Sequence, residues 1–200
     1  AGVSFPYEGI RNGQTKADRS TFKMDELGSD HAAPYTVVGA AGPKWFVMRA
    51  FEGYFLRAEG VLEGWNMGGG TVESLYNQGI TTSLAENGYT DVNLKGDPYT
   101  TSTLVPMTSG VDKNTVIAAT PSVPVCTVPV KFDAAGSKEY QLEQIITQKW
   151  IGLLPDSQEA YAERRRTHYP KLFDRLESEN PDVANTSLPV RLTYWTNEYT

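Results

Sequence analysis

Several residue types are scarce in this chain of 200 amino acids, and each scarcity excludes a class of protein. A single cysteine, Cys126, excludes an internal disulfide framework and any zinc site built from several cysteines. The two histidines, His31 and His168, are far apart in sequence, so they indicate neither a metal cluster nor a Cys–His nucleophile. No apolar run is long enough to cross a bilayer, and the first residues lack the pattern of a signal peptide.

Positive charge is also scarce. The chain holds 18 Lys and Arg against 24 Asp and Glu, a formal net charge of −6, and its only local basic cluster is Arg164 to Arg166. Such a chain lacks the broad positive surface on which nucleic acids bind. Its residues are 40% hydrophobic and 11% aromatic, which is enough for a real core. We therefore expect a folded protein that does not bind nucleic acid.

The first clear pattern begins after Pro43. Apolar residues recur there at steps of three and four, which predicts a helix over 45–66 with one buried face: Met48, Phe51, Phe55, Ala58, Leu62 and Trp65. Three glycines at 68–70 turn the chain, and Thr71 is placed to cap a second helix over 71–87. Because the connection is short, the two helices should be antiparallel.

A second helix pair is predicted near the end of the chain. Ser137 is a suitable N-cap for a helix over 137–153, and Asp156 with Glu159 has the spacing of a capping box. The latter opens a helix over 157–168 that Pro170 ends. We expect the pairs, about 45–87 and 137–169, to pack together and to bury Trp65 and Trp150.

Between the pairs lies a long irregular segment, 89–136, rich in Gly, Pro, Thr and Ser, with short β-prone runs at 115–118 and 123–130. Residues 1–43 also form loop, with at most one short strand at 35–38. Long loops inside a compact protein usually carry function, although a packing role is the simpler interpretation.

Two acidic groupings suggest chemistry. Glu59 and Glu63 are one helical turn apart, as an acid/base pair would be. Because Arg49 and Arg57 are interleaved with them, we expect ion pairs with these arginines against another helix instead. The acids and arginines of 159–166 are likewise expected to pair structurally.

The second grouping, Asp91, Asn93 and Asp97, begins like a calcium loop. However, Ser102 occupies the last loop position, where an EF-hand needs an acidic residue that binds calcium through both oxygens. A helix–loop–helix calcium site is therefore rejected. A looser site with oxygen ligands only stays open. No cofactor is expected.

Five segments together resemble the SusD/RagB family of nutrient-binding outer-membrane lipoproteins. They are Tyr54 to Gly60 with Gly64-Trp65, Leu75 to Ile80, Ile145 to Ile151, Glu159 to Pro170, and Pro189 to Tyr194. Their order and spacing carry the resemblance, which covers roughly residues 44–88 and 137–195.

The resemblance implies a mainly α fold in which antiparallel, tetratricopeptide-like helix pairs form a scaffold and irregular loops form a ligand surface. It also implies that residues 1–200 are a single domain from the C-terminal part of a longer SusD-like protein, without its lipid anchor and first helical repeats. Such proteins are surface-exposed at the outer membrane and are joined to it only through that anchor. They hold oligosaccharides or peptides for a SusC-like TonB-dependent transporter and perform no chemistry.

Three functions therefore compete: a nutrient-binding protein, which is the leading hypothesis, a glycan-degrading enzyme using a carboxylate pair, and a tetratricopeptide-like interaction scaffold. For the first, a sugar site needs aromatic planes for the C–H faces and polar partners for the hydroxyls. The long segment offers both in Tyr89, Asn93, Asp97 and Tyr99. The alternative is that the two tyrosines only fix the segment to the scaffold.

Overall fold

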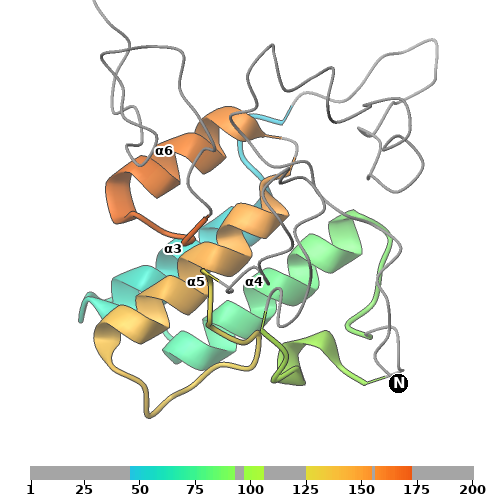
Figure 1. Ribbon diagram of the computed structural model, residues 1–200. Helices are drawn as coiled ribbons and strands as arrows, with labels where there is room; N and C mark the ends of the chain where they lie inside the picture. The colour runs from blue at the N-terminus through green and yellow to red at the C-terminus, as the bar shows by residue number, and fades with distance from the viewer. Residues whose placement is uncertain (1–45, 93–96, 106–124, 155, 173–200) are drawn as a thin grey trace, which may run out of the picture. The chain divides into compact units, whose positions relative to one another are not determined.

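The computed structural model describes residues 46–92, 97–105, 125–154 and 156–172, all within one compact unit formed by 44–109 and 123–172. The helices in this part (Figure 1) are α3 (Ala50–Leu62), α4 (Val72–Glu86), the 3-10 helix η1 (Tyr99–Thr101), α5 (Lys138–Gly152) and α6 (Ser157–Thr167). No strand occurs among the described residues. The predicted mainly helical fold is confirmed.

Helices α3 and α4 form the first antiparallel pair. The start of α3 meets the end of α4, where the Ala50 backbone N–H donates to Glu86 Oε1 (3.2 Å). Further along, the Phe55 ring lies against Gly79, where an added Cβ would come within 2.9 Å of the ring. Glycine at this position therefore allows the two helices to approach closely.

The prediction for α3 was too long at both ends. Arg49 has extended backbone angles (φ −98°, ψ 151°), and its N–H donates to the Glu52 carboxylate (2.6 Å), which fixes the helix start after it. At the other end Gly64 adopts φ +87°, and the chain turns away from the helix axis. Met48 therefore does not extend the buried face and is 56% exposed.

Helices α4, α5 and α6 start where their capping residues predicted. Thr71 Oγ1 accepts from the Ser74 N–H, and Ser137 Oγ accepts from the Tyr140 N–H. Asp156 Oδ1 accepts from the N–H of Glu159 at the start of α6. Each cap satisfies a backbone donor that would otherwise lack a partner.

Helices α5 and α6 form the second antiparallel pair. Near the end of α5, Lys149 contacts Glu159 in the first turn of α6. Near the start of α5, Glu139 accepts a hydrogen bond from Tyr169, which follows α6 (2.7 Å). The pairs pack on each other, because a Cβ added at Gly152 would lie 2.9 Å from the Phe51 ring of α3.

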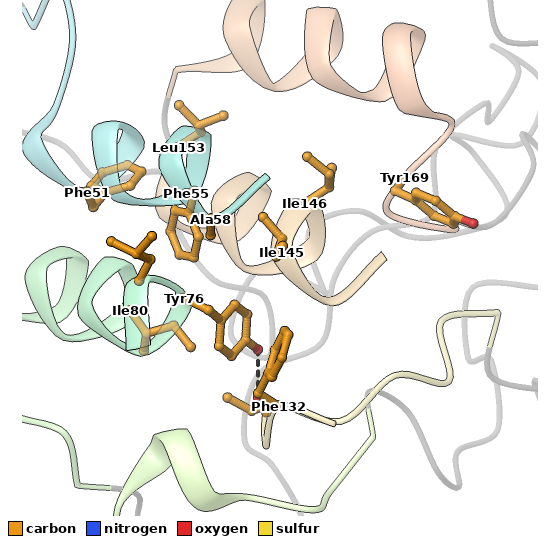
Figure 2. Packing of buried hydrophobic residues seen from close by; sticks show 12 residues of the cluster. Phe51, Phe55, Ala58, Tyr76, Ile80, Phe132, Ile145, Ile146, Leu153 and Tyr169 are labelled. Atoms are coloured by element: carbon orange, nitrogen blue, oxygen red, sulfur yellow. Dashed lines mark hydrogen bonds between the residues drawn. The ribbon is translucent and has the colours of Figure 1, made fainter. Parts of the chain in front are cut away.

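Aromatic and aliphatic side chains fill the space between α3, α4 and α5 (Figure 2). The labelled core residues include Phe51, Phe55, Tyr76 and Ile145, each at most 1% exposed. The expected burial of two tryptophans is wrong for Trp65, which is 66% exposed because α3 ends before it. Trp150 is only partly buried.

A buried polar face of α5 holds the chain that precedes it. Gln144 Nε2 donates to the carbonyls of Pro129 (3.0 Å) and Lys131 (2.7 Å). The Tyr76 hydroxyl donates to the Val130 carbonyl (2.6 Å), a bond that is drawn as a dashed line from Tyr76 in Figure 2. Side chains thus satisfy these carbonyls, and the described part of the β-prone run, 125–130, forms no strand.

Other predicted features lie outside the described residues, namely the short strand at 35–38, the run at 115–118 and the segment 189–194. Within the described part of the chain, no helix has the length and apolar character that crossing a membrane requires.

Candidate functional site

Three of the four predicted ligand residues lie in the described part of the chain, and Asn93 lies outside it. Tyr89 lies three residues after the end of α4, and its N–H donates back to the Leu84 carbonyl (2.9 Å). Its side chain is 68% exposed. Asp97 is exposed just before η1. An aromatic plane and a carboxylate are therefore both accessible on this segment.

Tyr99 has a different environment. Its ring packs partly buried against the core, and its hydroxyl is 3.2 Å from Gln148 Oε1 of α5, to which it donates. Burial raises the pKa of the Tyr99 phenol, and the hydrogen bond to Gln148 opposes this only in part. This tyrosine therefore attaches η1 to the scaffold, and only the remaining part of its side chain is accessible to a ligand.

Asp91 also has a structural partner. Its carboxylate accepts from the Thr100 N–H (3.0 Å) and from the Thr100 hydroxyl (2.6 Å). These two bonds close the segment between α4 and η1, so the carboxylate is already used within the loop. Among the described residues, no group of three His, Cys, Asp or Glu is placed to hold a metal ion.

The two carboxylates considered for catalysis are both ion-paired. Arg166 of α6 donates to both oxygens of Glu59, at 2.5 and 2.9 Å, and Lys138 of α5 lies 2.6 Å from Glu63. The predicted partners, Arg49 and Arg57, were wrong. Residues two apart on a helix do not face each other, so Arg57 cannot readily pair with Glu59, and the cations come from neighbouring helices instead.

A buried ion network joins α5 to α6. Lys149 is 1% exposed and lies 3.0 Å from Glu163 and 3.5 Å from Glu159. Glu163 also accepts from Arg166 (2.8 Å). Burial alone would raise the pKa of Glu163, but the bond from Arg166 and the charge of Lys149 outweigh it and lower that pKa. The expected structural pairing of the 159–166 charges is confirmed for Glu163 and Arg166.

Trp65 is an accessible aromatic residue that the sequence pattern assigns to the core, because it continues the apolar spacing of α3. The signal that could have found it is Gly64, since glycine often ends a helix. With Tyr89, this tryptophan gives the described surface two aromatic side chains more than 60% exposed, both on the chain immediately after a helix.

Comparison with known proteins gives a match along nearly the whole chain. The family model described as SusD-like, Susd and RagB outer membrane lipoprotein, matches residues 3–200. A SusD homolog from Bacteroides thetaiotaomicron has 31% sequence identity and a TM-score of 0.78, over 96% of this chain and 38% of the homolog. A comparison with curated proteins gave no match.

Two further solved structures are similar. A chitin-binding SusD homolog from Flavobacterium johnsoniae is 36% identical with a TM-score of 0.61, over 80% of this chain and 33% of that one. A SusD homolog from Bacteroides ovatus is 36% identical with a TM-score of 0.60, over 76% of this chain and 30% of that one. The chain thus spans about a third of the length of these relatives.

Proposed function

Because the chain belongs to the SusD-like family of outer membrane lipoproteins, we propose that it takes part in binding nutrients at the cell surface, with oligosaccharides as the favoured ligand. The bound nutrient is handed to a SusC-like TonB-dependent transporter. Residues 1–200 act as a single domain, the C-terminal part of such a protein. The observation that carries the proposal is the family match over residues 3–200.

The description of one relative as chitin-binding supports a carbohydrate ligand. The scaffold supports a binding role in general, because its helix pairs are fixed by caps, a packed core and ion pairs between helices. Binding by a rigid scaffold costs less conformational entropy than binding by a mobile one. Within this chain, we propose Tyr89, Asn93, Asp97 and Tyr99 as ligand contacts.

The enzyme alternative is disfavoured by the state of its carboxylates. Glycoside hydrolysis needs one carboxyl that donates a proton and a second that acts as a base or nucleophile next to the sugar. Glu59 is held on both oxygens by Arg166, and Glu63 is held by Lys138. Both are therefore occupied in joining α3 to α6 and α5.

An array of glycans and peptides probed with the purified chain tests the proposal. We expect binding to an oligosaccharide class and a loss of about tenfold or more in affinity for Tyr89→Ala or Asp97→Ala, since one polar or stacking contact contributes about 1.4 kcal/mol in favourable cases. Tyr161→Ala is the matched control, because Tyr161 is an exposed aromatic side chain of α6 outside the proposed contacts, and its affinity should match that of the parent. If the chain captures only proteins, and neither glycans nor peptides, the scaffold hypothesis replaces this one.

A further inference from the structure

The loop between α3 and α4 presents Trp65 to solvent in a defined position. Helix α3 ends at Leu62, Gly64 turns the chain with φ +87°, and the Trp65 N–H donates back to the Gly60 carbonyl (2.8 Å). The indole is 66% exposed. Tryptophan carries one of the largest apolar surfaces of any residue, so leaving it in water forgoes a large gain from burial.

The rest of the loop is tied to the scaffold by direct contacts. The Arg57 guanidinium of α3 donates to the carbonyls of Met67 (3.1 Å) and Gly69 (3.0 Å). The Met67 side chain lies on Gly60, where an added Cβ would come within 2.7 Å of it. A loop held in this way fixes the backbone position of Trp65 before any ligand arrives, which lowers the entropy cost of binding.

Polar groups flank the indole in the chain. Asn66 follows it directly and accepts from the Gly68 N–H through Oδ1 (3.2 Å), which leaves its amide nitrogen as a donor for a ligand. Two residues before it, Glu63 pairs with Lys138 in a partly exposed ion pair. An aromatic plane beside amide and charged groups is the combination that sugar rings need, since their C–H faces stack while their hydroxyls form hydrogen bonds.

We propose that Trp65 is a stacking platform for an oligosaccharide ring, with Asn66 as a hydrogen-bonding partner. The platform is separate from the segment of Tyr89 to Tyr99, because the two adjoin opposite ends of α4, whose 15 residues span about 22 Å. This inference rests on the proposed function and adds a second contact region for the same class of ligand.

Calorimetric titration of the purified chain with chitohexaose, cellohexaose and maltoheptaose tests the platform. We expect Trp65→Ala to weaken binding of the recognised glycan by about tenfold, and Trp65→Phe to stay within about threefold, because phenylalanine keeps an aromatic face. Both variants should unfold at the temperature of the parent chain, since the side chain is exposed. Tyr161→Ala, at a 38% exposed aromatic of α6, is the matched control and should bind normally.

A second measurement uses tryptophan fluorescence. Bound glycan should protect the parent chain from acrylamide quenching and give less protection in Trp65→Phe. Unchanged affinity of Trp65→Ala, with weakened binding by Tyr89→Ala, overturns the platform and leaves the proposed function intact. Absence of binding to every glycan, by parent and variants alike, overturns both.

Discussion

At the scale of single residues, a row of aromatic rings determines how closely the first helix pair can pack. Phe51 and Phe55 lie edge to face with centroids 6.2 Å apart, Phe55 meets Tyr76 at 6.2 Å, and Tyr76 meets Phe132 at 5.1 Å. Such contacts add to the stability that burial alone provides. The row has room only because Gly79 of α4 carries no side chain where the Phe55 ring lies.

Gly79→Ala should therefore destabilise the chain. The new Cβ would lie 2.9 Å from two carbons of the Phe55 ring, which is closer than van der Waals contact and forces the ring or the helix to move. Overpacking of this kind costs about 1–3 kcal/mol, more than the gain in helix propensity returns. Chemical denaturation followed by circular dichroism measures the loss.

Gly53→Ala is the control for this substitution. It makes the same chemical change within a helix of the same pair, but nothing lies within 4 Å of its added Cβ. Replacing a helical glycine with alanine should raise the free energy of unfolding by about 0.5–1 kcal/mol. Equal effects at both positions would mean that the contact between Phe55 and Gly79 does not limit the approach of the helices.

At the scale of helices, capping residues were the most informative part of the sequence. Thr71, Ser137 and Asp156 each cap the helix that follows, and the predicted starts agree with the structure. The ends of α3 could not be predicted as well, because its apolar spacing continues through Met48 and Trp65 beyond the helix itself. Periodicity alone does not separate a helix from flanking residues that happen to match its spacing.

The buried polar face of α5 was also beyond the reach of sequence patterns. Gln141, Gln144 and Gln148 are each at most 9% exposed, although glutamine is usually found on the surface. Gln141 donates hydrogen bonds to three carbonyls of the adjoining loop, 133–136. Gln148 accepts a hydrogen bond from Tyr99, which is distant in sequence. Such partners become visible only when the chain is folded.

The link between α5 and α6 should depend on Glu163. Among the acidic side chains of the described residues, replacement by Gln leaves the buried ammonium of Lys149 with only the more distant Glu159, at 3.5 Å. Breaking a buried ion pair costs about 3–5 kcal/mol when no other partner remains, so we expect about 2–3 kcal/mol here. Denaturant titration at neutral pH measures this difference.

Acid titration gives an independent check of the same pair. The pKa of Glu163 lies below its ordinary value of 4.5, so the folded state favours the charged form. The corresponding stability is present above about pH 4.5 and is lost as the pH falls through the lower, folded-state pKa. The stability of Glu163→Gln should therefore fall less steeply than that of the parent between pH 5 and 3. Parallel curves would contradict the pairing.

At the scale of the whole molecule, the family and the helix-pair architecture followed from the sequence, while the ion-pair partners of Glu59 and Glu63 did not. Both carboxylates proposed as an alternative catalytic pair have cationic partners far along the chain, with Glu59 and Arg166 separated by 107 positions. A pattern confined to one helix contains no information about such partners. The residues proposed for ligand binding were chosen by type, and the structure adds that Tyr99 is partly committed to Gln148.

The ion pair of Glu59 leads to a prediction about the activity of the whole chain. If Glu59 serves to join α3 and α6, the purified chain should release no reducing sugar from any glycan that it binds. Glu59→Gln should lower stability by about 1 kcal/mol, because Arg166 is half exposed and such pairs are screened by solvent. Glycan affinity should stay within about twofold of the parent, since the substitution removes no proposed ligand contact.

Arg166→Gln provides the matched control, because it breaks the same ion pair from the other helix and leaves the Glu59 carboxylate in place. Arg166→Gln should lose more stability than Glu59→Gln, because it also removes the bond from Arg166 to Glu163 (2.8 Å). The double variant should lose less than the sum of the two, as expected for residues that act as a pair. Reducing-sugar assays and thermal denaturation are made on the same preparations. Glycan turnover that disappears in Glu59→Gln, while folding is retained and Arg166→Gln remains active, would instead identify Glu59 as a catalytic group.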